Sequence, residues 1–440
     1  MSATDLEPVV VPPSNRTVAR KVVIASFVGT SLESYDFYVF AYFSAIFSAP
    51  LFFPEQDLAA GTILSFLLLA MSYLVRPLGA IIFGHLGDRI GRKRTLLWTI
   101  GIMGIATGAI GLLPDFAQLG ILAPILLAVL RIVQGLSLGG EWGGSILLAT
   151  EHASYRRRGF YAALPQLGSP VGTILTGALF LLLTFTLSNE DMLAWGWRLP
   201  FLLAFPLLGV SLYLRLAIDE TPIFKALVTT NRRARIPVLD VFRTHPFAVV
   251  VAICAALLGI GSYSLMNTYT LAYGVTTLGF SYQELFQATL IGSLLQLVTI
   301  PAFGILANRI GSARVVAIGA LGTLLITFPM YWMLQFATFP ILVGTMIIGG
   351  ILPTLAWAGL GGLMSDLFSG PVRYSALSIA YSVAAVISGL IPLATQALAN
   401  ATGSAWWHPG IVLALLSVLT LAASLIAQRI RVRDEVIAES

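Results

Sequence analysis

The chain contains one basic, glycine-bearing segment twice. The segment GHLGDRIGRKR occupies residues 84–94, and a degraded copy, GILANRIGSAR, occupies residues 304–314. Their starting points are separated by half of the 440-residue chain. Each copy follows the second long apolar stretch of its half, and two glycines match in position, Gly84 with Gly304 and Gly91 with Gly311. The sequence therefore predicts two similar halves.

The composition indicates that most of the chain lies in lipid. It is 57% hydrophobic and 10% charged, whereas soluble domains have roughly 25% charged residues. The mean hydropathy is +0.89, which is more apolar surface than a fold in water can bury. Crossing about 30 Å of hydrocarbon takes about 20 apolar residues. We expect spans near residues 22–47, 59–83, 96–113, 121–150, 159–186, 198–217, 247–272, 284–306, 315–334, 339–367, 374–400 and 410–428.

These spans predict an all-α membrane protein with twelve transmembrane helices. Helices satisfy their own backbone groups in lipid, and the apolar stretches lack the alternation of barrel strands. The first apolar run continues from Val22 to about Phe47, which is too long for a cleaved signal peptide. We therefore expect an uncleaved first span.

The basic residues sort to one side of these spans. Nearly all Lys and Arg residues precede the first span, follow the last, or lie in loops after even-numbered spans; the opposite face keeps Arg198. Such asymmetry marks the cytoplasmic side, so both termini are predicted to be cytoplasmic. The net charge of +5 then reflects topology, and no nucleic-acid partner is expected.

The longest polar loop divides the chain into two parts. We expect an N-terminal six-helix bundle over residues 1–217, a central cytoplasmic loop over 218–245 and a C-terminal six-helix bundle over 246–440. Pseudo-symmetric bundles of this kind are an architecture of secondary transporters, in which one half rocks against the other around a central site. The sequence therefore favours alternating access.

Several motifs resemble those of known transporters. Residues 84–94 resemble the signature loop of the major facilitator superfamily. Six further motifs resemble those of one family within this superfamily, the metabolite:proton symporters. They are ESYDFY (33–38), RPLG (76–79), RIVQG (131–135), GGEWG (139–143), WGWR (195–198) and DETP (219–222). Members carry proline, betaines, di- and tricarboxylates and shikimate. The resemblance implies proton symport of a small polar metabolite across the cell inner membrane, although Asn308 replaces the acid usual in the second-half repeat.

Five ionisable residues fall within the spans of the first half: Glu33, Asp36, Arg76, Arg131 and Glu141. Charged groups in lipid are costly and mark functional sites. Two carboxylate–arginine pairs leave one acid over. That acid would bind a proton readily, because its charged form is unfavourable in a buried position. The surplus acid is a physical basis for proton coupling.

We predict that Asp36 and Arg131 form the proton-coupling pair. At 1.5 Å per residue, Asp36 lies about 21 Å from the cytoplasmic start of its span and Arg131 about 15 Å from the opposite face, which are similar heights. Glu33 lies one helical turn from Asp36, on roughly the same face, and shares the role. The resemblance implies the same pair, since sugar-type facilitators place an acid in span one against an arginine in span four. The alternative is a permanent ion pair that fixes packing.

Arg76 is predicted to bind a substrate carboxylate, because the guanidinium fork suits that group. The alternatives are an ion pair with Glu141 or extension of the side chain toward the cytoplasm. Glu141 could instead face the cationic ammonium group of a substrate such as a betaine. Trp142 beside it would then add cation–π attraction. We expect uncharged substrate contacts at Tyr35, Gln166, Tyr263, Asn267, Trp357 and Tyr381. The alternative role for these side chains is packing between helices.

The repeated basic loop is expected to gate the cytoplasmic side. Its glycines permit close helix approach, and Asp88 suits the N-terminus of a neighbouring helix. Such contacts would close the inner side and break as the halves rock; setting topology alone is the alternative. The predicted gating residues are Gly84, Gly87, Asp88, Arg89, Gly91, Arg92, Glu151 and Arg158.

Other function classes lack sequence support. No glycine loop with a lysine suits a nucleotide phosphate, and the scattered histidines and single Cys254 predict no metal site. We expect no enzyme activity and no cofactor, with protons as the coupling ion and a monomer as the functional unit. Export by proton antiport is the main alternative, because residues 168–172 partly resemble the glycine-proline signature of drug antiporters; a channel is a weaker one.

Overall fold

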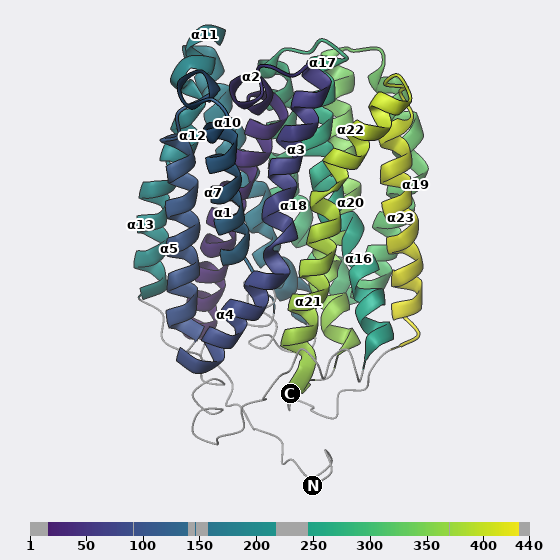
Figure 1. Ribbon diagram of the computed structural model, residues 1–440. Coiled ribbons are helices and arrows are strands. Elements are labelled where there is room, and N and C mark those ends of the chain that lie inside the picture. Colours follow the sequence, from purple (N-terminus) through teal and green to yellow (C-terminus); the bar gives the residue numbers. More distant parts are fainter. Residues whose placement is uncertain are drawn as a thin grey trace.

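The computed structural model describes residues 16–90, 92–139, 146, 157–216, 245–368 and 370–430. Within these ranges the chain forms helices joined by turns, and no strand occurs there. The helices stand side by side as one tall bundle (Figure 1). The predicted all-α class is therefore confirmed for the described part of the chain.

The first half follows the predicted spans, with interruptions. Val75 breaks the second span between two helices, and the sixth is helical from Asn189, so the WGWR motif lies inside it. The elements are α1 (Arg16–Ile46), α2 (Ser48–Phe52), α3 (Leu58–Leu74), α4 (Arg76–Ile90), α5 (Arg92–Gly111), α6 (Phe116–Leu119), α7 (Leu122–Ser137), α9 (Arg158–Ala163), η2 (Pro165–Leu167), α10 (Gly168–Thr186), α11 (Asn189–Asp191), η3 (Met192–Gly196), α12 (Arg198–Leu202) and α13 (Ala204–Leu216).

The second half has longer helices. Its first span contains a π-helical turn, and the start of α18 carries a capping box in which Ser281 and Glu284 satisfy each other's backbone N–H groups. The elements are α16 (Pro246–Ser264), η4 (Leu265–Tyr269), α17 (Thr270–Thr276), α18 (Tyr282–Ile310), α19 (Ser312–Leu334), α20 (Phe339–Leu367), α21 (Gly370–Gly389), α22 (Ile391–Ala401) and α23 (His408–Ala427).

The described residues include 9 helical stretches long and apolar enough to cross a membrane. They cover every predicted span of the second half and three of the first. The shorter apolar helices Leu97–Gly111 and Leu122–Ser137, together with α1, match the remaining positions. Side chains such as Val298 and Leu325 are exposed on the outside, as a lipid-facing surface requires. The total of twelve spans stays a prediction.

Glycines let α7 pack directly on α3 and α4. A Cβ added at Gly79 would lie 1.9 Å from the Leu136 carbonyl oxygen, and one at Gly135 would lie 2.1 Å from the Ser72 carbonyl oxygen. Membrane helices approach this closely where small residues replace side chains. The contact brings together the two first-half segments that carry buried arginines.

The two halves contact each other at both ends of α18. Near its start, Gln283 Nε2 donates to the Thr184 carbonyl oxygen on α10 over 3.1 Å. Near its end, the Phe160 backbone N–H on α9 donates to Asn308 Oδ1, also over 3.1 Å. The two halves are therefore joined near the start and near the end of α18.

Candidate functional site

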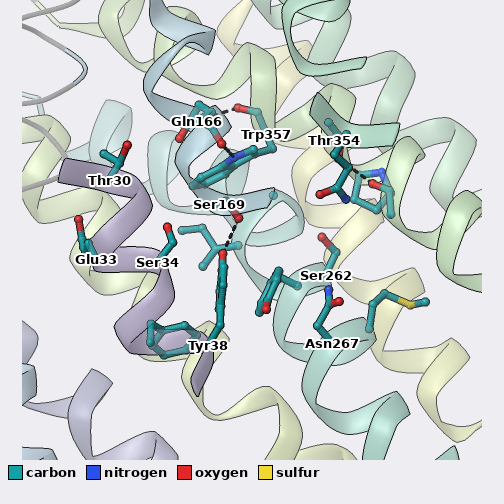
Figure 2. A pocket seen from close by; sticks show the side chains of 18 of the residues that line it. Thr30, Glu33, Ser34, Tyr38, Gln166, Ser169, Ser262, Asn267, Thr354 and Trp357 are labelled. Carbon is teal, nitrogen blue, oxygen red and sulfur yellow. Dashed lines mark hydrogen bonds between the residues drawn. The ribbon is translucent and has the colours of Figure 1, made fainter. Parts of the chain in front are cut away.

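A cavity of about 110 Å³ lies between the two halves. Figure 2 shows α1 on one side of it and side chains from the second half on the other. Its walls combine tyrosines, amides and hydroxyls with one arginine and one carboxylate. The polar and aromatic lining includes Thr30, Glu33, Ser34, Tyr38, Tyr73, Arg76, Gln166 and Ser169 from the first half, and Ser262, Tyr263, Asn267, Gln296, Thr354, Trp357 and Tyr381 from the second.

This central cavity contains most of the predicted substrate-contact residues. They are Arg76, Gln166, Tyr263, Asn267, Trp357 and Tyr381, together with Glu33, which was expected in proton coupling. Tyr35 is not among them. Its side chain is buried on another face of α1, where its hydroxyl donates to the Pro200 carbonyl oxygen over 2.7 Å. The predicted contact between Tyr35 and substrate therefore does not fit the place of this side chain.

Arg76 begins α4 and lines the central cavity. The guanidinium carbon lies 4.6 Å from the ring centre of Tyr73 and 5.7 Å from that of Phe37. The residue is 7% exposed, and its Nε is buried with no hydrogen-bond partner among the described residues. A buried donor without a partner is costly, so this position favours an incoming acceptor such as a carboxylate.

Asp36 and Arg131 are joined through Gln134. Asp36 is 4% exposed and Arg131 is 1% exposed. Arg131 Nη1 donates to Gln134 Oε1 over 2.7 Å, and Gln134 Nε2 lies 3.4 Å from each carboxylate oxygen of Asp36. The two predicted partners thus share one buried network, with an amide side chain as the link.

Asp36 lies on a second, smaller cavity inside the first half. This cavity of about 30 Å³ is bordered by α1, α5 and α13, and its lining includes Glu33, Tyr35 and Asp36. Glu33 lines both cavities, whereas Asp36 lines only the smaller one. The expectation that Glu33 and Asp36 share a face of α1 therefore holds in part. Glu33 connects the wall of the central cavity with the region around Asp36.

Aromatic and hydroxyl side chains cross between the halves at the central cavity. The rings of Tyr38 on α1 and Tyr263 on α16 are stacked with centroids 3.9 Å apart. The Tyr38 and Ser169 hydroxyls are hydrogen-bonded (Figure 2), and Thr173 Oγ1 donates to the Tyr263 hydroxyl over 3.3 Å. The Tyr38–Ser169 bond lies within the first half, whereas the two contacts of Tyr263 cross between the halves and have to separate if the halves move apart around the cavity.

Gln166 and Trp357 make a reciprocal contact across the same boundary. Gln166 Nε2 donates to the Trp357 carbonyl oxygen over 3.3 Å, and Trp357 Nε1 donates to the Gln166 carbonyl oxygen over 3.4 Å. Both residues were predicted as substrate contacts. The structure gives them a joining role between the halves in addition to a place on the cavity wall.

Sequence reasoning missed Tyr38, Tyr73 and Gln134. Tyr38 follows Ser34 by one helical turn, so the helical period around Glu33 is the signal that identifies it. Gln134 follows Arg131 by three residues and faces the same partners for the same reason. Tyr73 precedes Arg76 by three residues, and the same helical period brings its ring to the guanidinium.

The predicted gate is described only in part. Gly84, Gly87, Asp88 and Arg89 lie in α4, Arg92 begins α5 and Arg158 begins α9, and of these residues only the backbone is described. Gly91, Glu141, Trp142 and Glu151 lie outside the described residues.

The second copy of the repeat is fully described and contacts the first half. A Cβ at Gly304 would lie 2.8 Å from Ala163 Cβ, and a Cβ at Gly159 would lie 2.8 Å from Asn308 Oδ1. Asn308 also accepts the Phe160 N–H. The neutral amide thus makes an inter-half contact at the position where an acid is usual in the repeat.

The described residues contain no group of three or more His, Cys, Asp or Glu side chains suited to a metal ion. What they do contain is a polar cavity between two helical halves, with buried ionisable groups beside it. Buried charge at the boundary of two membrane-spanning bundles is typical of solute transporters. The fold and the site thus define the class: a multi-pass membrane transport protein rather than an enzyme.

The chain belongs to the Major Facilitator Superfamily, whose family model matches residues 34–336. It is 35% identical to the inner membrane metabolite transport protein YhjE of Escherichia coli (strain K12), over 93% of this chain and 94% of that one. It is 34% identical to the shikimate transporter of the same strain, over 91% and 93% of the two chains. A putative proline/betaine transporter of Staphylococcus haemolyticus is 33% identical, over 91% and 86%.

Solved structures support the same fold. A D-xylose-proton symporter superimposes with a TM-score of 0.72 at 18% identity, covering 94% of this chain and 98% of that one. The xylose transporter XylE from E. coli, in a partially occluded inward-open conformation, gives a TM-score of 0.71 at 16% identity, covering 96% and 100%. The expected superfamily membership, transport function and inner-membrane location are confirmed by the family model and by the relatives named as metabolite transport proteins.

Proposed function

We propose that this protein takes up a small carboxylate-bearing metabolite together with protons, by alternating access. The substrate is an organic acid or a zwitterion of the betaine or proline type. The observation that carries the proposal is Arg76: a buried guanidinium on the central cavity whose Nε has no partner among the described residues. A substrate carboxylate supplies the missing acceptor and matches the fork of the side chain.

The second charge on the cavity distinguishes the two substrate classes. Glu33 lines the same cavity as Arg76, so a zwitterion can offer its carboxylate to Arg76 and its cationic end to Glu33. An organic acid such as a hydroxylated carboxylate would use Arg76 and the neutral amides and hydroxyls. Relatives described as a shikimate transporter and as putative proline/betaine transporters represent both classes.

Asp36 is the proposed proton carrier, with Arg131 as its charge partner and Glu33 as the connection to the substrate cavity. Arg131 and Arg76 both act electrostatically on Asp36, so binding of an anion at Arg76 changes the charge balance that Asp36 experiences. This is a route by which substrate and proton binding are coupled in free energy.

The two halves would move as units around the central cavity. We place the boundaries of these units at residues 1–217 and 246–440, with 218–245 as a cytoplasmic connection and both termini cytoplasmic. Twelve spans, a monomeric functional state and no cofactor other than the coupling proton complete the proposal. The contacts at both ends of α18 suit a state in which the cavity is closed from both sides.

The test is transport by the purified protein in liposomes. Labelled shikimate, glycine betaine and proline are offered with an imposed inward proton gradient, an outward gradient or none. Accumulation driven by the inward gradient supports symport. Accumulation driven only by the outward gradient supports the antiport alternative, and flux that does not saturate supports a channel.

A binding measurement separates the substrate classes without transport. Ligands that bind the folded protein raise its thermal unfolding temperature. Stabilisation by carboxylates that lack a cationic group, lost in Arg76→Ala and kept in Glu33→Gln, indicates an organic acid. Stabilisation by betaine or proline, lost in both variants, indicates a zwitterion. Stabilisation that persists unchanged in the Arg76→Ala variant contradicts the assigned role of this arginine.

A further inference from the structure

Gln134 stands between the acid and the arginine of the buried network in the first half. Its side chain is fully buried on α7. Its Oε1 accepts from Arg131 Nη1 over 2.7 Å, and its Nε2 donates to Thr107 Oγ1 on α5 over 2.6 Å. The same nitrogen lies 3.4 Å from both oxygens of Asp36. Each polar atom of the amide is therefore engaged, and the partners differ in chemistry.

The orientation of this amide follows from its neighbours. A guanidinium has only donors, and an ionised carboxylate has only acceptors. The amide oxygen must therefore face Arg131, and the nitrogen must face Asp36. An amide is a side-chain group that serves both partners while adding no charge between them.

The remaining contacts of Arg131 are also neutral. Its Nε and Nη2 donate to the carbonyl oxygens of Leu68 and Leu69 on α3 over 3.4 and 3.3 Å. Its guanidinium carbon lies 3.8 Å from the ring centre of Phe40. With Nη1 taken by Gln134, the guanidinium is held in place by groups that carry no negative charge.

The amide replaces a strong contact by a weak one. A direct bond between Arg131 and Asp36 would join two ions, and such bonds are roughly twice as strong as neutral ones. The contact present is a neutral donor at 3.4 Å from the carboxylate, which is beyond the usual hydrogen-bond range. Little is lost from this contact when Asp36 takes up a proton.

We propose that Gln134 is a positioning residue for proton coupling: it separates Asp36 from Arg131 and so keeps Asp36 able to bind and release a proton. Gln134 itself carries no proton. The inference rests on the proposed function, in which Asp36 is the proton carrier, and it assigns a role to a residue that touches neither the central cavity nor the substrate.

The other groups around Asp36 do not take this role. Arg76 acts on Asp36 from α4, Glu33 and Tyr35 lie beside it on α1, and Tyr73 on α3 acts on Arg131. The described lining residues from α5 and α13 are uncharged, namely Ile100, Met103, Gly104, Ala204, Leu207, Leu208 and Ser211. A change confined to Gln134 leaves all of these groups in place.

The experiment titrates Asp36 directly in the full-length protein in lipid nanodiscs, with no substrate added. Infrared spectroscopy follows the carbonyl band of the protonated carboxyl group, and the Asp36 band in each background is the one that Asp36→Asn removes. In Gln134→Met the freed Arg131 pairs with Asp36, so we expect at least a tenfold lower proton affinity. In Gln134→Glu the added carboxylate pairs with Arg131 and repels ionised Asp36, so we expect at least a tenfold higher one.

Ser137→Ala is the matched control, because it removes a buried hydroxyl whose one hydrogen bond within the described part of the chain is to the Gln134 backbone oxygen, and it leaves the amide network intact. Its proton affinity is expected within threefold of the wild type. Opposite shifts of more than threefold in the two Gln134 variants support the inference, and any other pattern overturns it. If Gln134→Met does not fold, Gln134→Leu replaces it with the same expected direction, because it also removes the amide between Arg131 and Asp36.

Different results would overturn the positioning role of Gln134 and the proposed function of the protein. A band that titrates but does not respond to the Gln134 variants overturns the positioning role alone. Proton-driven accumulation that persists in Asp36→Asn overturns the proposed function itself.

Discussion

Two faces of helix α1 carry the two roles proposed for this protein, substrate binding and proton binding. Thr30, Ser34 and Tyr38 line the central cavity (Figure 2), whereas Tyr35 and Asp36 line the smaller cavity inside the first half. Glu33 borders both. A helix that separates the two cavities can keep substrate and proton apart while coupling their charges.

Asp36→Asn is expected to abolish substrate accumulation driven by a proton gradient, because the amide cannot exchange a proton. Exchange of labelled for unlabelled substrate across the membrane, which needs no net proton movement, should continue. Transport in liposomes under the two regimes measures both properties. Full accumulation in this variant removes Asp36 from the mechanism.

Arg76→Lys tests whether the fork of the guanidinium, rather than its charge, holds the substrate. Lysine keeps the charge but cannot make two parallel bonds to one carboxylate. Hydrogen bonds to charged groups contribute about 1.5–3 kcal/mol, so we expect roughly a tenfold to hundredfold weaker substrate affinity. Saturation of uptake measures it. An unchanged affinity would show that charge alone suffices.

Gly79→Ala is expected to destabilise the first half, because the new methyl group would meet the Leu136 carbonyl oxygen. Overpacking typically costs about 1–3 kcal/mol. Gly101→Ala on α5 is the matched control, since its Cβ would have no atom within 4 Å. Thermal unfolding of the two purified variants should show a loss for the first only. Equal stability would contradict the close packing of α4 on α7.

The charged part of the site was predictable from sequence, and its neutral part was predictable only in part. Charge in an apolar span is rare and costly, so Glu33, Asp36, Arg76 and Arg131 are conspicuous without any structure. Gln134 is neutral and attracts attention only once its three partners are known. Tyr35 was expected among the uncharged substrate contacts, but its hydroxyl donates to the Pro200 carbonyl oxygen instead.

At the scale of elements, α9 and the end of α18 form the described contact at the repeated loop. Asn308 accepts the Phe160 N–H with a neutral oxygen. The usual acid would make this a charge-assisted bond. The neutral version is weaker and separates more easily as the halves move.

Asn308→Asp is therefore expected to hold this contact closed, and Asn308→Ala to loosen it. A bond of this kind contributes about 1 kcal/mol, or roughly a fivefold change in population. Alkylation of Ala307→Cys in a Cys254→Ser background reports separation of α9 from the end of α18. The reason is that Ala307 Cβ would lie 3.1 Å from a Cβ at Gly159, so the cysteine is covered while the contact holds. We expect labelling to be slower with Asp and faster with Ala. The reverse order would exclude Asn308 as part of a gate.

The positions of the long helices were predictable because hydropathy alone sets them. The second-half spans coincide with predicted ones to within a few residues. The break at Val75 and the π-helical turns at Met192–Gly196 and Leu265–Tyr269 were not. Such irregular backbone depends on tertiary partners, which a hydropathy profile does not contain.

At the scale of the whole molecule, a disulfide across the halves should stop the cycle. A Cβ at Gly361 would lie 3.4 Å from Ala162 Cβ, close to the separation that disulfides require. In a Cys254→Ser background, Ala162→Cys with Gly361→Cys is expected to abolish transport when oxidised and to restore it on reduction. Either cysteine alone is the control. Transport that continues while the bond is intact would contradict rocking of the two halves.

The length of α18 and its contacts near both ends bear on how the protein keeps the two sides of the membrane separate. It is a single rod of 29 residues, about 43 Å long at 1.5 Å per residue, and it is fastened to the opposite half near each tip. A tilt that releases one tip pivots the other inward. In the proposed cycle the two aqueous compartments would then never be connected at once, so the proton gradient that drives uptake would not be dissipated through the transporter itself.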